Sequence, residues 1–222
     1  MTTHTTRVWD LPTRIFHWAL FVLIIAMVGT GLTGGNAMVW HFRCGYAVLS
    51  LLLFRLVWGV VGGRWSRFAS FIYAPGTIVR YLKGQGRPEH SVGHNPLGSG
   101  SVFALLLFLC AQVGTGLFSN DDIAASGPLS KYVSNAVVSS LTGYHKNIGK
   151  YVLLALVALH IGAIAFYQLK KKEGLIGPMV HGDKLLVHPV DNSRDDARSR
   201  VLAGAVFALC AGLVATMVKL AG

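Results

Sequence analysis

Five long apolar segments restrict the fold of this chain more than any other feature of its sequence. They cover approximately residues 11–32, 41–61, 97–118, 145–169 and 201–220. Each has about the 20 residues that a helix needs to cross the hydrocarbon core of a bilayer. The chain is 53% hydrophobic and only 13% charged, which differs strongly from an average soluble domain. We therefore predict an all-α, polytopic membrane protein.

Lysine and arginine are concentrated in alternate polar segments. The 62–96 loop holds five of them and the 170–200 segment holds seven, whereas the connection at 33–40 holds none and that at 119–143 holds one. Because cytoplasmic loops carry the excess of Lys and Arg, we expect a cytoplasmic N-terminus and a C-terminus on the outer side. Retained cationic loops also account for the net charge of +11, so no nucleic acid is expected as a partner.

Four histidines lie within the apolar segments, where ionisable residues are costly and indicate functional sites. His145 and His160 are fifteen residues apart, which is about 22 Å along a helix and about 60° around it. Both rings can therefore face the interior of one bundle, near opposite faces of the membrane. We assign His41 to the outer level with His145. We assign His17 to the cytoplasmic level with His160.

A bis-histidine haem is the simplest use of each pair. Neutral imidazole is a good iron ligand, and two rings from facing helices can hold a planar macrocycle in a bundle core. Zinc or copper is the competing metal, but each level offers only two donors because the segments contain no internal Asp or Glu. A haem-free transporter or scaffold is a further alternative.

Four other residues are assigned to these sites. Gly31, fourteen residues after His17, lets the outer haem approach the backbone. Arg55 is well inside its segment and needs an anionic partner, for which a haem propionate is suited. Arg14 is a second candidate for a propionate, with interfacial snorkelling as the alternative. His94 opens the third long segment, where it can serve a quinone headgroup; a solvated histidine is the alternative.

Several motifs occur together in a characteristic order. They are Arg14-Ile15-Phe16-His17-Trp18, His41 with Gly45-Tyr46, Phe54-Arg55-Leu56-Val57-Trp58-Gly59, Arg67-Phe68-Ala69-Ser70-Phe71, Gly93-His94-Asn95-Pro96-Leu97-Gly98, and His145 with His160. As an ordered set over about residues 7–185, they resemble the bacterial cytochrome b561 family. The similarity is greatest to its branch of b-type cytochrome subunits of Ni/Fe-hydrogenases.

The resemblance implies a four-helix bundle that binds two haem b groups in the bacterial inner membrane, within residues 1–185. Residues 186–222 would add a linker and a fifth transmembrane helix, which departs from the four-helix core. Family members exchange electrons between ubiquinone or menaquinone and a periplasmic redox partner, such as a c-type cytochrome. The family also contains superoxide:quinone oxidoreductases, which act without a protein partner. With both axial positions of each iron filled, no catalytic residue is expected, and a homo-oligomer is left open.

Overall fold

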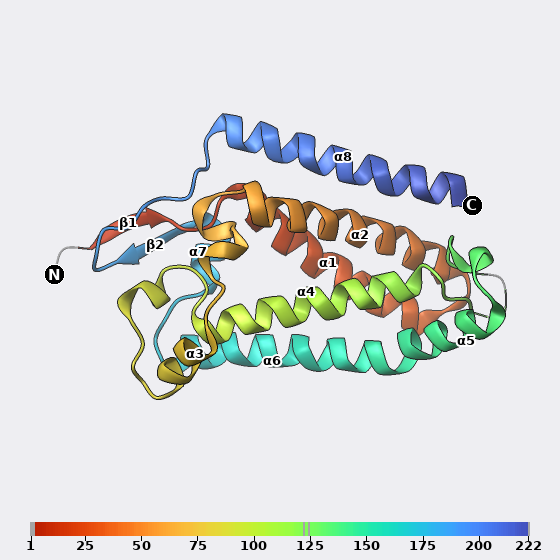
Figure 1. The fold of residues 1–222 in the computed structure, drawn as a ribbon, viewed down its shortest axis with the longest axis horizontal. Coiled ribbons are helices and arrows are strands. Elements are labelled where there is room, and N and C mark those ends of the chain that lie inside the picture. The colour runs from red at the N-terminus through yellow and green to blue at the C-terminus, as the bar shows by residue number, and fades with distance from the viewer. Residues whose placement is uncertain (1–2, 122, 124, 222) are drawn as a thin grey trace. The chain divides into compact units, whose positions relative to one another are not determined.

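The structure is a computed structural model that describes residues 3–121, 123 and 125–221. Its long helices (Figure 1) are α1 (Leu11–Thr33), α2 (Met38–Val61), α4 (Pro96–Gly116), α6 (Lys150–Leu169) and α8 (Ala197–Ala221). The shorter elements are β1 (His4–Arg7), α3 (Pro75–Leu82), α5 (Asn135–Gly143), α7 (Ile176–His181) and β2 (Asp183–Leu186). Five helical stretches of the described chain are long and apolar enough to cross a membrane. The expected class, an all-α polytopic membrane protein, is confirmed.

Helix α4 ends at Gly116, two residues before its expected end, and three other helix boundaries also differ from those expected. Helix α2 begins at Met38, three residues early, because the preceding break is confined to Gly34 and Gly35, which both have positive φ angles (66° and 51°). Helix α8 begins four residues early because the Asp196 carboxylate accepts the Ser199 N–H at 2.7 Å and caps the first turn. Helix α5 continues through a π-helical turn, Tyr144–Gly149, directly into α6.

The chain forms two compact units, and the border between them falls within the long helices. The first unit comprises Met1–Phe16, Arg55–Ala104 and Leu159–Val206, and the second comprises His17–Phe54, Leu105–Ala158 and Phe207–Gly222. The domain boundary expected after residue 185 stays a prediction.

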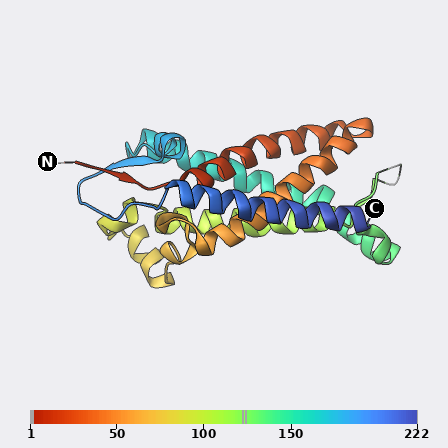
Figure 2. The same cartoon turned by 90° about the horizontal axis from the view of Figure 1, so that it is seen from above.

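In the first unit, strands β1 and β2 form an antiparallel pair. His4 lies opposite Leu186 and Arg7 opposite Asp183, and the two strands are side by side in both ribbon views (Figures 1 and 2). Behind them, Val8 and Val92 belong to a small apolar core with Leu186. The sequence did not predict this sheet, because neither four-residue strand has a clear alternating pattern of its own.

In the second unit, α1, α2, α4 and α6 share one apolar core. Its buried members are Val48, Leu52, Leu109, Val113 and Leu153. In lipid such cores are stabilised mainly by close packing, because lipid tails are as apolar as the side chains. Many side chains on the same helices point outward and are apolar, such as Leu107, which is 68% exposed. This pattern is typical of lipid-facing helices.

Candidate functional site

His41 lies one turn inside α2, and the end of α1 determines how its ring is oriented. The ring atom Nδ1 is 3.0 Å from the carbonyl oxygen of Met27 and 3.3 Å from the hydroxyl of Thr30. A carbonyl oxygen can only accept, so Nδ1 carries the proton and Nε2 keeps its lone pair. Gly31 makes this approach possible, because a Cβ atom there would lie 3.0 Å from Cε1 of the ring.

His145 is held by α4 in the same way. Its Nδ1 is 2.8 Å from the carbonyl oxygen of Gln112 and 3.4 Å from the hydroxyl of Thr115. A Cβ atom at Gly116 would lie 2.9 Å from Cε1 of the ring. His145 is part of the π-turn, and its backbone carbonyl accepts a hydrogen bond of 2.9 Å from the side-chain amide of Gln112. Its Nε2, too, is therefore available to bind a metal.

The rings of His41 and His145 lie close together within the second unit. Their centroids are 6.2 Å apart and their planes are inclined by 86°. Two metal–imidazole bonds of about 2.0–2.1 Å, plus roughly 1.2 Å from each nitrogen to its ring centre, would separate the centroids by about 6.4 Å. The residues therefore fit a single metal ion bound from both sides, as in a bis-histidine haem. Within the described chain, no cluster of three or more His, Cys, Asp or Glu could hold a metal on its own, which disfavours zinc.

Sequence motifs alone miss Thr30, Gln112, Thr115 and Gly116, although a short repeat indicates them. The segments that differ only at their second residue are Ala26-Met27-Val28-Gly29-Thr30-Gly31-Leu32 and Ala111-Gln112-Val113-Gly114-Thr115-Gly116-Leu117. Each repeat is followed in the next long helix by a histidine with a glycine four residues later. We call the residues that hold each histidine ring its cradle. The two cradles thus come from one sequence pattern that occurs twice.

His17 and His160, the second expected pair, belong to different units. In the second unit, the ring of His17 lies edge-on to Trp18 with 5.1 Å between centroids. In the first unit, Nδ1 of His160 is 3.5 Å from the hydroxyl of Ser101, which is at the outer limit of a hydrogen bond. Their pairing around a metal stays a prediction.

Arg55 lies on α2 in the first unit and is only 3% exposed. Its guanidinium lies over the ring of Phe68, 4.5 Å from the centroid, and Gly59 leaves the space that this ring occupies. The buried Nη1 atom has no hydrogen-bond partner, and none of the ion pairs between described residues includes Arg55. A cation–π contact offsets only about 2 kcal/mol, far less than the cost of burying a charge. The environment therefore fits an additional anionic group, such as a propionate.

The contacts of Arg14 and His94 do not test the roles expected for these two residues, which stay predictions. Nη1 of Arg14 donates to the carbonyl oxygen of Val180 at 2.6 Å, so part of its guanidinium is already engaged. The ring of His94 contacts the rings of Trp9 and Phe71, whose centroids are 4.7 Å and 4.5 Å away. This aromatic surrounding is compatible with a flat headgroup beside His94.

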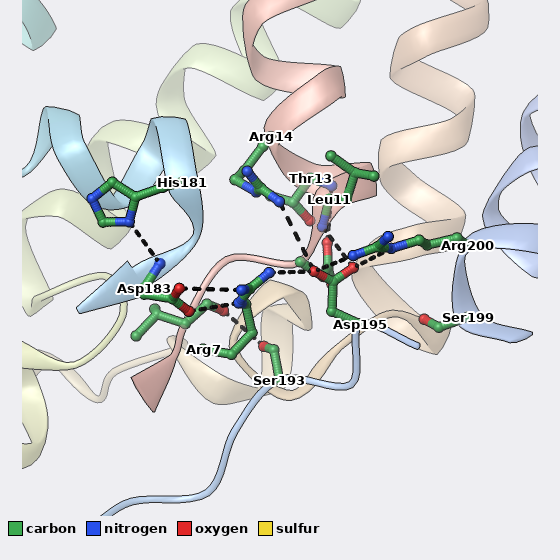
Figure 3. A network of polar contacts seen from close by, with 12 residues as sticks. Arg7, Leu11, Thr13, Arg14, His181, Asp183, Ser193, Asp195, Ser199 and Arg200 are labelled. Carbon is green, nitrogen blue, oxygen red and sulfur yellow. Dashed lines mark hydrogen bonds and ion pairs between the residues drawn. The ribbon is translucent and has the colours of Figure 1, made fainter. Parts of the chain in front are cut away.

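Asp195 is the centre of a polar network in the first unit that the sequence did not indicate (Figure 3). Its carboxylate accepts hydrogen bonds from Arg7, from Arg200 and from the backbone N–H of Leu11 at the start of α1. Arg7 also pairs with Asp183 of β2 at 2.6 Å. Burial alone would raise the pKa of Asp195, but the hydrogen bonds from Arg200, Leu11 and Arg7 outweigh it and lower that pKa.

Asp10 joins the start of α1 to the residues that follow α2. Its fully buried carboxylate accepts hydrogen bonds from the backbone N–H groups of Thr13 and Gly63, at 2.9 Å and 3.0 Å. The hydroxyl of Ser66 and the indole of Trp58 also donate to it, at 2.8 Å and 3.3 Å. Four donors satisfy a charge that would otherwise be costly to bury.

These features define the chain as an all-α polytopic membrane protein with two histidines close together in its helix bundle. The chain belongs to the prokaryotic cytochrome b561 family, whose family model matches residues 8–182. It is therefore a b561-type electron-transfer cytochrome, and membership of this family implies haem b. The matched range ends before α8 begins.

Curated relatives are named "Probable Ni/Fe-hydrogenase B-type cytochrome subunit". The relative from Rhizobium leguminosarum bv. viciae is 26% identical over 214 residues, which cover 80% of this chain and 88% of that protein. The corresponding hydrogenase 1 subunit of Escherichia coli (strain K12) is 23% identical over 209 residues, covering 79% and 88%. No solved structure matches the chain at a significant level.

Proposed function

We propose that this protein is a di-haem electron conduit of the bacterial inner membrane. It would exchange electrons between the quinone pool and a periplasmic redox partner such as a c-type cytochrome. The observation that carries the proposal is the His41–His145 pair, with 6.2 Å between ring centroids. Each ring also has its Nδ1 engaged by a backbone carbonyl, which leaves both Nε2 atoms available as ligands. Haem b, when bound, supplies reversible one-electron chemistry.

The protein's own residues would place and tune the two centres. His41 and His145 hold the outer centre. His17 and His160 hold the cytoplasmic one, in the orientation that the positive loops favour. The buried guanidinium of Arg55 would neutralise a propionate. His94, in contact with two aromatic rings, would serve the quinone headgroup.

The identity of the periplasmic partner is a separate part of the proposal. The names of the curated relatives make a Ni/Fe-hydrogenase the competing partner. Haem reduction by a purified reduced c-type cytochrome, but not by a hydrogenase with hydrogen, would support the first choice. The reverse result would replace the c-type cytochrome with a Ni/Fe-hydrogenase as the proposed partner.

Redox-titrated absorbance of the purified protein tests the ligand assignment. The wild type should show a reduced b-type band with two components. His41→Ala and His145→Ala should remove the same component, and His17→Ala and His160→Ala the other. Loss of one component by both His160→Ala and His41→Ala would refute the pairing. Absence of any b-type band in the wild type would favour a haem-free transporter or scaffold.

A superoxide:quinone oxidoreductase is the second candidate. Arg43 and Lys146 lie within two residues of the proposed outer ligands and are both exposed, so they can attract a small anion. Rapid haem reduction by superoxide without a partner protein, slowed in Arg43→Ser and Lys146→Ser at low ionic strength, would favour this function. Failure of superoxide to reduce the haem would exclude it.

A further inference from the structure

Gln112 holds both the ring and the backbone of His145. Its carbonyl oxygen accepts the Nδ1 hydrogen bond at 2.8 Å, and its side-chain Nε2 donates to the His145 carbonyl at 2.9 Å. The contacts are local to the second unit and come from one turn of α4. A single residue therefore controls the orientation of the ring and the path of the chain that carries it.

The equivalent residue of the other cradle is Met27, which makes only half of these contacts. Its carbonyl oxygen accepts from His41, but its thioether side chain offers no donor to the backbone. Both side chains lie beside the glycine that follows the histidine by four residues, but Gln112 lies much closer to its glycine than Met27 does. A Cβ atom at Gly45 would lie 3.7 Å from the Met27 methyl, and a Cβ atom at Gly149 would lie 2.1 Å from Oε1 of Gln112. Met27 thus lies beside Gly45, and Gln112 lies beside Gly149. Of the two, only Gln112 donates a hydrogen bond to the backbone there, to the carbonyl of His145.

The π-turn supplies the reason for this difference. A π-turn is wider than an α-helical turn, because its hydrogen bonds join residues five apart instead of four. Such turns are frequent at functional sites. The carbonyl of His145 lies in this turn, and the Gln112 side-chain amide donates to it. The remaining atom of that amide, Oε1, is buried without a hydrogen-bond partner. Leaving such an atom unpaired is costly, so the position of this amide is not explained by stability alone.

We propose that Gln112 is a positioning residue that sets the reduction potential of the centre held by His41 and His145. This inference rests on the proposed haem ligation. A firmly held Nδ1–H···O bond makes the imidazole a stronger donor to the metal, which favours the ferric over the ferrous state. The amide of Gln112 maintains that bond by fixing the π-turn. It also fixes the inclination of 86° between the two rings.

The test compares the substitutions Gln112→Met and Gly149→Ala with the control Gly45→Ala. Gln112→Met introduces the residue of the equivalent cradle and removes the amide. Gly149→Ala keeps the amide but occupies its place, whereas a Cβ at Gly45 makes only an ordinary contact. The first two variants should shift the ferric–ferrous equilibrium of this centre about 3- to 10-fold toward the ferrous state. This corresponds to a rise in midpoint potential of about 30–60 mV for one electron. Gly45→Ala should keep the wild-type value.

The electron paramagnetic resonance spectrum gives a second readout that a general packing defect would not change. Two axial imidazoles with nearly perpendicular planes give a strongly anisotropic low-spin ferric signal, and this anisotropy should fall when the ring of His145 can turn. Selective loss of this haem from both variants would assign Gln112 to haem retention alone and would overturn the inference. Wild-type potential and spectrum in both variants, or loss of both haems from both, would overturn it. A wild type without b-type haem would instead refute the proposed function.

Discussion

Replacing Gly116 with alanine tests whether the missing side chain on α4 keeps the His145 ring in place. The new Cβ atom would lie 2.9 Å from Cε1 of the ring, whereas two carbon atoms in good contact are about 3.5–4.0 Å apart. The ring therefore has to move by about 0.6–1 Å. Its hydrogen bond to the Gln112 carbonyl, now 2.8 Å, would lengthen beyond the usual limit of about 3.2 Å.

The expected loss of haem-binding free energy follows from these changes. Overpacking costs about 1–3 kcal/mol, and the weakened hydrogen bond adds about 0.5–1.5 kcal/mol. The better helix propensity of alanine recovers up to about 1 kcal/mol. The net loss is about 0.5–4.5 kcal/mol, which weakens haem binding about 2- to 2,000-fold.

Titration of haem-depleted protein with haem, followed by the reduced b-type band, measures this loss. The control is Gly114→Ala, two residues away on the same helix, where no other part of the described chain lies within 4 Å of the new Cβ. Gly31→Ala and Gly29→Ala form the matching pair on α1. The new Cβ atom at position 31 would lie 3.0 Å from Cε1 of His41, whereas the Cβ atom at position 29 would have no neighbour in the described chain within 4 Å. Equal haem affinities for Gly116→Ala and Gly114→Ala would refute the reasoning.

Arg55 and Asp195 give two further predictions. Arg55→Leu should lower the midpoint potential of the haem proposed for His17 and His160. A cation favours the reduced state by about 1.7 kcal/mol at a distance of about 10 Å and an effective dielectric constant of about 20. An unchanged redox titration would contradict this prediction. Asp195→Asn should destabilise the protein by about 1.5–3 kcal/mol at neutral pH, measured by thermal unfolding in detergent. Because the folded pKa of Asp195 is lowered, its contribution is present above about pH 4 and is lost as the pH falls through the folded value. The difference between wild type and variant should therefore shrink in acid, and a constant difference would refute the linkage.

The class of fold and the positions of the long helices could be predicted from the sequence. A spanning segment must satisfy all its backbone groups internally, so a long apolar run admits few structures. The same reasoning indicated His41 and His145 as partners at one depth, and the structure places their rings 6.2 Å apart. Helical rise alone was sufficient for this, because depth in a membrane depends on position in the sequence.

The polar contacts of the first unit could not be predicted in this way. Asp195 and Arg7 are 188 residues apart and belong to segments without periodicity. Their contact depends on how two loops meet, and no local propensity carries that information. Asp10 is similar, because an aspartate before a proline-containing first turn already has a complete explanation as a helix cap. Its further bonds to Trp58 and Ser66 depend on tertiary structure.

The π-turn accounts for an unequal spacing in the sequence. Arg55 follows His41 by fourteen residues, and His160 follows His145 by fifteen. A π-turn closes over five residues instead of four and so accommodates one additional residue. The spacing therefore predicts that His160 corresponds in α6 to Arg55 in α2. The repeated pattern thus gives two equivalent histidines at one level and a histidine with an arginine at the other. The two expected haems would consequently have unlike electrostatic surroundings, and the cation beside one of them would raise its reduction potential relative to the other.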